Sequence, residues 1–97
     1  MRNIIDYSIR NIRTREGLEA VISAVPTKNR DKILRFLKSY DPVLVGCFVL
    51  RDPITKKVHS TANLCYEKDG YEWTNEVTYL FEKYNIKLND DFIKKFD

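Results

Sequence analysis

Histidine, cysteine and glycine are scarce in this sequence, which contains one histidine, two cysteines and three glycines among 97 residues. Cys47 and Cys65 are too far apart for a C-x-x-C redox or zinc motif, and a single histidine does not complete a metal site. The glycines are isolated from one another, so the chain has neither a Walker loop nor a dinucleotide-binding motif. We therefore expect no metal, no cofactor and no enzymatic activity.

Long hydrophobic runs are also absent. The longest run, residues 43–50, is far shorter than the ~20 residues of a membrane-spanning helix. Residues 1–12 include Arg2, Asp6 and Arg10, so they do not form a signal peptide. We therefore expect a cytoplasmic protein without membrane association, in which both cysteines stay reduced and fill apolar positions in strands.

A strong charge of one sign is missing as well, because the net charge is only +3 at pH 7. The charge is unevenly distributed, however. Residues 1–51 contain ten Lys or Arg and five Asp or Glu (+5), and residues 52–97 contain seven and nine (−2). The composition, with 43% hydrophobic and 32% charged residues, is that of one globular domain spanning residues 1–97.

Two helices are predicted in the first quarter of the chain. Asn3 is a suitable N-cap for a helix over residues 3–12, in which Ile5, Ile9 and Ile12 share one face, although residues 5–9 also alternate as in a strand. Thr14 is a suitable N-cap for a second helix, whose apolar residues recur at helical spacing up to Val25. Pro26 ends that helix.

A third helix is predicted between Thr27 or Asn29, either of which can cap it, and Asp41-Pro42, which stops it. Its buried stripe consists of Ile33, Phe36, Leu37 and Tyr40. The opposite face has only Asp31 as an acid, and its cations are Lys28, Lys32, Arg35 and Lys38. This basic face could bind phosphates or an acidic protein surface, or could simply be solvated.

Residues 43–50, with the sequence VLVGCFVL, are apolar on both faces of an extended chain and are predicted to form a central strand. Gly46 within this strand suggests a bulge or a close backbone approach. A turn at Asp52-Pro53 leads to a second strand over residues 58–67. Asp69-Gly70 then predicts a type I′ turn into a third, antiparallel strand.

That two-residue turn fixes the register of the hairpin. The expected cross-strand pairs are Lys68 with Tyr71, Glu67 with Glu72, and Tyr66 with Trp73. Two glutamates directly opposite each other repel, so a partner's cation could compensate them, or the edge could be solvated. The face that carries Tyr66 and Trp73 is either core or an exposed platform, with Tyr71 as its most exposed member.

Two further helices are predicted at the end of the chain. Thr74 caps the first, whose buried stripe is Val77, Leu80, Phe81 and Tyr84, and Asn89 caps a short second helix. The predicted fold class is therefore α+β, with N-terminal helices, a three-stranded antiparallel sheet, and C-terminal helices packed on one sheet face.

His59 does not belong to a recognisable catalytic group. Ser60 follows it directly, and alternation along a strand would place the two side chains on opposite faces. A nucleophile and its base must instead lie within hydrogen-bonding distance of each other. His59 is therefore predicted to have no catalytic role.

Several segments of the second half of the chain follow one pattern: DPITK at residues 52–56, DGYEWT at 69–74, YLFEKYN at 79–85 and LNDDFI at 88–93. This pattern resembles the C-terminal block of small uncharacterised proteins from low-GC Gram-positive bacteria and their mobile elements. The resemblance transfers no activity and no functional residues. It implies a bacterial or phage-borne cytoplasmic setting, in which many small proteins are immunity proteins, antitoxins or inhibitors.

The leading hypothesis is a non-enzymatic protein-interaction module of the immunity or inhibitor type. The candidate partner-binding residues are Lys28, Lys32, Arg35, Lys38, Glu67, Tyr71 and Glu72. The alternative is nucleic-acid binding by the basic helix face, joined by Arg13 and Arg15. A small-molecule site is a third hypothesis, for which the sequence offers no residue set, and an open sheet edge would allow a homodimer.

Overall fold

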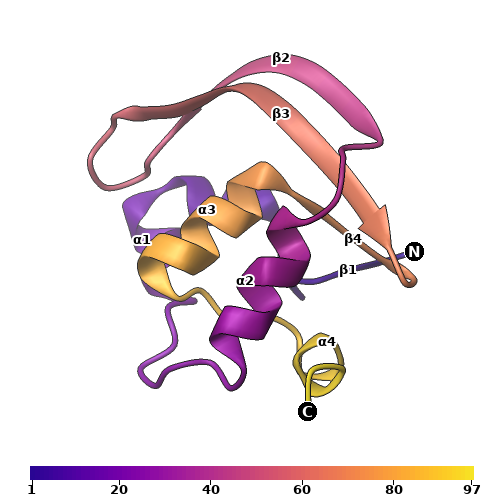
Figure 1. Cartoon of the computed structure of the whole chain (residues 1–97). Coiled ribbons are helices and arrows are strands. Elements are labelled where there is room, and N and C mark those ends of the chain that lie inside the picture. Colours follow the sequence, from indigo (N-terminus) through magenta and orange to yellow (C-terminus); the bar gives the residue numbers. More distant parts are fainter.

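The computed structural model describes residues 1–97 and shows an α+β fold with a four-stranded mixed sheet (Figure 1). The strands are β1 (Arg2–Asn3), β2 (Leu44–Arg51), β3 (Val58–Lys68) and β4 (Tyr71–Thr74), in the order β1-β4-β3-β2. The helices are the 3-10 helix η1 (Ile9–Arg13), α1 (Arg15–Glu19), α2 (Arg30–Lys38), α3 (Asn75–Tyr84) and α4 (Asp90–Lys94). The prediction of a three-stranded antiparallel sheet is wrong in one respect, because a fourth strand, β1, pairs in parallel with β4.

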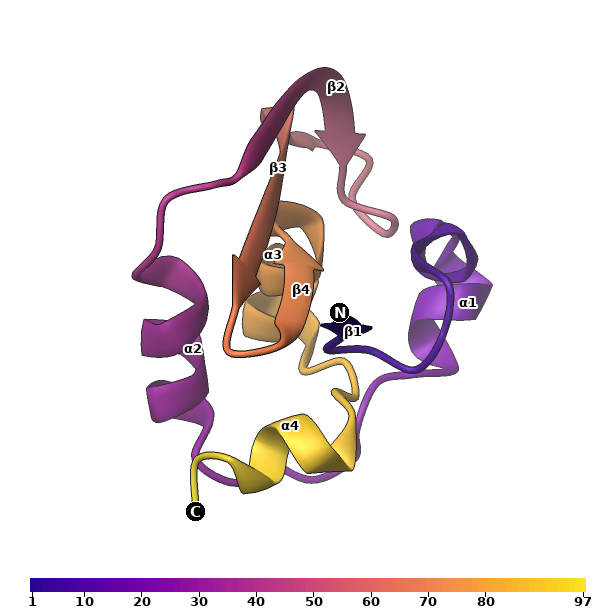
Figure 2. The same ribbon diagram turned by 90° about the vertical axis from the view of Figure 1, so that its right-hand side faces the viewer.

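The sheet and the helices are arranged so that the β2–β3 hairpin arches over α3 (Figure 1). A quarter turn away, α2 and α1 lie on opposite sides of α3 and β4, and α4 lies below them (Figure 2). We call the sheet face toward the helices the inner face. No helix is both long and apolar enough to cross a membrane.

The turn at Asp69-Gly70 is confirmed, together with the register that it fixes. Both residues have positive φ, 54° for Asp69 and 83° for Gly70, as a type I′ turn requires. Lys68 pairs with Tyr71, Glu67 with Glu72, and Tyr66 with Trp73. The twist of this turn matches that of the strands, which is why two residues are enough to set the pairing.

The predicted helix over residues 3–12 is wrong. Arg2 and Ile4 donate backbone hydrogen bonds to Gly70 and Glu72, so this segment enters the sheet, and helical structure begins only at Ile9. Thr14 caps α1 as predicted, but the helix ends at Glu19 instead of continuing to Val25. A turn follows α1, and Ile22 then forms an isolated antiparallel bridge with Ile86.

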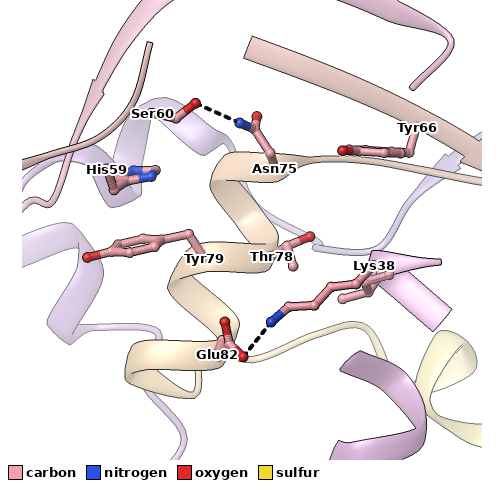
Figure 3. A pocket seen from close by; sticks show the side chains of 9 residues that line it. Lys38, His59, Ser60, Tyr66, Asn75, Thr78, Tyr79 and Glu82 are labelled. Carbon is pink, nitrogen blue, oxygen red and sulfur yellow. Dashed lines mark hydrogen bonds and ion pairs between the residues drawn. The ribbon is translucent and has the colours of Figure 1, made fainter. Parts of the chain in front are cut away.

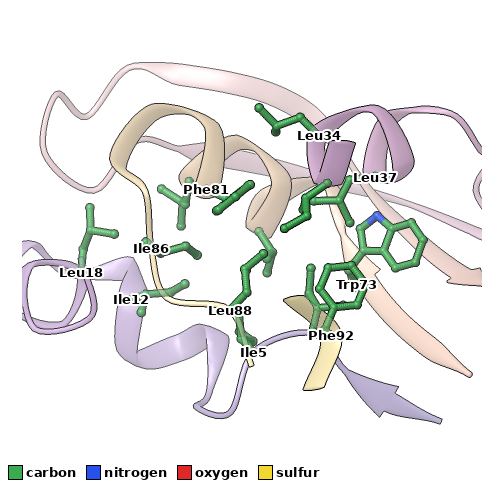
Figure 4. Close-up of a cluster of buried hydrophobic side chains, with 14 residues drawn as sticks. Ile5, Ile12, Leu18, Leu34, Leu37, Trp73, Phe81, Ile86, Leu88 and Phe92 are labelled. Carbon is green, nitrogen blue, oxygen red and sulfur yellow. The ribbon is translucent and has the colours of Figure 1, made fainter. Parts of the chain in front are cut away.

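The core lies between the inner face of the sheet and the helices (Figure 4). Its largest fully buried side chains include Trp73, Phe81 and Phe92. Tyr66 stacks on Trp73 with ring centroids 5.6 Å apart, so the aromatic face of the hairpin is core and not an exposed platform. The predicted caps Thr74 and Asn89 are confirmed, since each side chain accepts a backbone N–H of its helix.

Candidate functional site

Strand β2 exposes an extended apolar surface. Of the eight large hydrophobic side chains that are exposed, six lie on β2 or directly beside it, and these six are Val43, Leu44, Val45, Phe48, Val49 and Val58. Their exposed fractions run from 46% to 66%. The prediction of a central strand at residues 43–50 is therefore wrong, because β2 is an edge strand in which only Leu50 is buried. The helices lie beneath β3 and β4 and leave β2 overhanging (Figure 2).

Two irregularities in the pairing bend the β2–β3 hairpin into an arch. Phe48 and Val49 together face a single residue of β3, because Cys47 pairs with Ala62 and Leu50 with Ser60. His59 is then the extra residue on β3, between the partners of Leu50 and Arg51. Bulges of this kind bend and twist a strand. Gly46 itself is outside both bulges, and a Cβ there would meet only an ordinary contact.

The carboxamide of Asn75 completes the edge of β3 where β4 has ended. Its Oδ1 accepts the N–H of Leu64 at 3.0 Å, and its Nδ2 donates to the carbonyl of Ala62 at 2.9 Å. The backbone groups of these β3 residues therefore point toward α3 and not toward β2. Because Val45 pairs with Leu64 and Cys47 with Ala62, the backbone groups of Val45 and Cys47 point out of the open edge.

Asp52 fastens the far end of the arch to α3. Its carboxylate is fully buried and accepts the backbone N–H groups of Ile54 and Thr55, together with the hydroxyls of Tyr79 and Tyr84, both at 2.7 Å. Lys83 Nζ lies 3.1 Å away. Burial opposes ionisation of this group, but the hydrogen bonds outweigh burial and hold the pKa of Asp52 well below its usual range.

A polar cleft of about 340 Å³ lies under the arch, between β3 and the helices α2 and α3 (Figure 3). Lys38 Nζ and Glu82 Oε2 are 2.6 Å apart on its helical side. His59 stacks on Tyr79 with ring centroids 3.8 Å apart, its Nε2 is buried without a hydrogen-bond partner, and burial lowers its pKa. The lining residues belong to α2, β3 and α3, and none belongs to β2, so this cleft is separate from the open edge.

His59 and Ser60 both line this cleft, contrary to the prediction that they face opposite sides of the sheet. The bulge at His59 is the reason, because an extra residue breaks the alternation of side chains. Ser60 Oγ donates to the carbonyl of Ala62 and accepts from Asn75 Nδ2. These partners hold the hydroxyl, so Ser60 and His59 do not form a nucleophile–base pair in this structure.

The predicted basic face of α2 is partly neutralised within the chain. Lys28 forms an ion pair with Asp97 at 3.1 Å, and Lys38 forms the pair with Glu82. Lys32 and Arg35 are exposed and have no ion-pair partner. Only half of the four predicted cations are therefore free to meet a phosphate or an acidic surface.

The predicted hairpin residues lie apart from that basic face. Glu67 and Glu72 are directly opposite each other, as predicted, and line a shallow hollow of about 230 Å³ with Cys65. Tyr71 was expected to be the most exposed aromatic, but it is half-buried against Phe92, with ring centroids 5.0 Å apart. The structure thus separates the seven predicted partner-binding residues into two places, and neither includes the apolar edge of β2.

Comparisons of this chain with protein-family models, with curated proteins and with solved structures found no match. The resemblance of residues 52–93 to small Gram-positive proteins stays a prediction. The functional argument therefore depends on the surface of β2, which the sequence marked by its continuous apolar run but which we expected to be buried.

Proposed function

We propose that this chain is a protein-interaction module of the immunity or inhibitor type, acting in a bacterial or phage-borne cytoplasmic setting. It binds a protein partner by adding an extended segment to the open edge of β2. The supporting observation is that β2 combines unpaired backbone groups with exposed apolar side chains along a whole edge strand.

Strand addition divides the work between backbone and side chains. The outward N–H and C=O groups of Val45 and Cys47 would form ladder hydrogen bonds with the partner, and these provide affinity without regard to sequence. Alternate side chains of the added strand would lie on the inner and on the outer face of the extended sheet. Successive side chains of β2 that are exposed are apolar on both faces, so specificity would come from apolar residues of the added strand.

Nucleic-acid binding, the alternative function, has less support. Affinity for nucleic acid rises with the number of cations that neutralise phosphates. Two of the four predicted cations, Lys28 and Lys38, are already paired with Asp97 and Glu82. On β2, Arg51 is the one exposed cation, and the other exposed side chains carry no charge that could bind a phosphate.

A library of extended peptides displayed on phage tests the proposal. Selection on the immobilised full chain should enrich apolar peptides, and Val45→Lys should weaken their binding at least about tenfold, because a charge on an edge strand opposes pairing. Val25→Lys is the matched control, since Val25 is equally exposed but remote from β2. Failure to enrich any binder under conditions in which the chain is monomeric would overturn the proposal, as would binders that ignore Val45→Lys and are lost on Lys32→Glu and Arg35→Glu.

A further inference from the structure

The geometry points to a specific occupant of the β2 edge, a second copy of this chain. We propose that two chains form a two-fold dimer in which β2 of one pairs antiparallel with β2 of the other, joining two sheets into one. This inference rests on the proposed function, because it names a partner for the same open edge.

Two prolines fix how far such pairing can extend. Pro42 and Pro53 flank β2, proline has no N–H to donate to a ladder, and the N–H of Val43 already donates to the carbonyl of Cys65 at 2.8 Å, so the available segment is residues 44–51. Cys47 lies at the middle of that segment, and antiparallel pairing about it places Cys47 on the two-fold axis, opposite its own copy. The backbone groups of Cys47 and Val45 point outward, so Cys47 can exchange both backbone hydrogen bonds with the second Cys47.

The side chains of this segment complement one another in that register. Phe48 of each chain lies opposite Gly46 of the other, where the missing Cβ leaves room for the ring. Val45 lies opposite Val49, which pairs two β-branched side chains. Each chain thus sets the regular half of its strand against the bulged half of the other, and the contact is self-complementary, as a two-fold interface must be.

The charges at the two ends of β2 select the antiparallel orientation. Asp41 and Glu67 outnumber Lys68 near the start of β2, where Leu44 pairs with Cys65. Arg51 ends the strand, and Lys57 precedes its partner Val58. Antiparallel pairing brings the acidic end of one copy to the basic end of the other, whereas parallel pairing would bring like charges together.

The exposed area gives a reason for association. The six exposed side chains of the β2 region together present on the order of 600 Å² to water, distributed over both faces of the strand. A standard interface buries about 800 Å² on each partner. The exposed side chains on both faces of β2 and the edge backbone together would supply most of that value.

Sedimentation velocity over a concentration series tests the dimer. The full chain should sediment as twice its 11.5 kDa mass, and Val45→Lys should raise the dissociation constant at least about tenfold while circular dichroism stays native. Val25→Lys should leave the constant unchanged. A rescue tests the register, because a mixture of Val45→Lys and Val49→Glu chains should form a heterodimer that neither variant alone forms.

Crosslinking supplies a second, independent measurement. In a Cys65→Ser background, a short bis-maleimide should join two chains through Cys47, and adding Val45→Lys should abolish the product. In a Cys47→Ser background, Cys65 should give no crosslinked dimer.

Two results would overturn the dimer. One is a monomer at every concentration tested, and the other is a dimer that resists Val45→Lys and does not crosslink at Cys47. A monomer that still binds library peptides at β2 refutes the dimer and leaves the proposed function standing. A monomer that binds no peptide refutes both.

Discussion

Asp52 illustrates how one buried side chain can hold an arch in place. The residue begins the turn between β2 and β3, and its carboxylate receives hydrogen bonds from that turn and from two tyrosines of α3. Its five donors, including Lys83, satisfy an ionised carboxylate that water cannot reach. The turn is therefore tied to the helix beneath it, and with the turn the exposed strand β2.

Asp52→Asn should destabilise the fold by roughly 2–4 kcal/mol at pH 7, because an amide nitrogen would face groups that donate hydrogen bonds. The effect should depend on pH. The pKa of Asp52 is lower in the folded chain than the ~3.9 of an unfolded one, so its contribution is complete above about pH 5 and declines as the pH falls below about 4. Urea unfolding between pH 3 and 7, measured on both proteins, should show their difference shrinking in acid.

Asp6→Asn is the matched control for that experiment. Asp6 is 63% exposed and makes only a surface ion pair with Arg2 at 3.7 Å, so its replacement should change stability by less than about 1 kcal/mol. A difference between Asp52→Asn and wild type that stays constant from pH 7 to pH 3 would contradict the role of the ionised carboxylate.

At the scale of elements, Asn75 links the start of α3 to the edge of β3. Asn75→Ala should cost about 1–3 kcal/mol, because the N–H of Leu64 and the carbonyl of Ala62 would lose their partners. Amide exchange should locate the damage, with faster exchange at Leu64 and unchanged exchange at Val77 in α3. Asn75→Asp keeps an acceptor for Leu64 and should protect that amide better than alanine does. Equal exchange at Leu64 in all three proteins would refute the assignment.

The elements predicted correctly are those that are determined by residues close together in the sequence. The turn at Asp69-Gly70, the caps Thr74 and Asn89, and α3 itself each depend on residues within a few positions of one another. Strand β1 depends on a partner about 70 residues away, so the helical spacing of its neighbours misled the prediction. The burial of residues 43–50 was predicted wrongly for a related reason. An apolar run indicates a strand, but whether other elements cover that strand is decided by where the helices pack.

At the scale of the whole molecule, the two ends of the chain close the fold together. Ile4 follows β1, is fully buried, and its carbonyl accepts the backbone N–H of Asn89 at 2.8 Å. The side chain of Asn89 donates to the carbonyl of Asn3 at 3.0 Å and accepts the N–H of Phe92 at 2.8 Å. One buried residue therefore both starts α4 and ties it to the first strand of the sheet.

Two substitutions separate these roles of Asn89. Asn89→Ala removes the helix cap and the bond to β1, so it should destabilise the chain by roughly 2–4 kcal/mol in urea unfolding. Asn89→Asp keeps an acceptor for Phe92 but cannot donate to Asn3, and it also places a carboxylate against that carbonyl. If the hydrogen bond from Asn89 to Asn3 contributes more stability than the helix cap, Asn89→Asp should be nearly as unstable as Asn89→Ala. An aspartate variant as stable as wild type would instead show that Asn89 acts through the helix cap, and that Ile4 and its neighbours hold the N-terminus by burial.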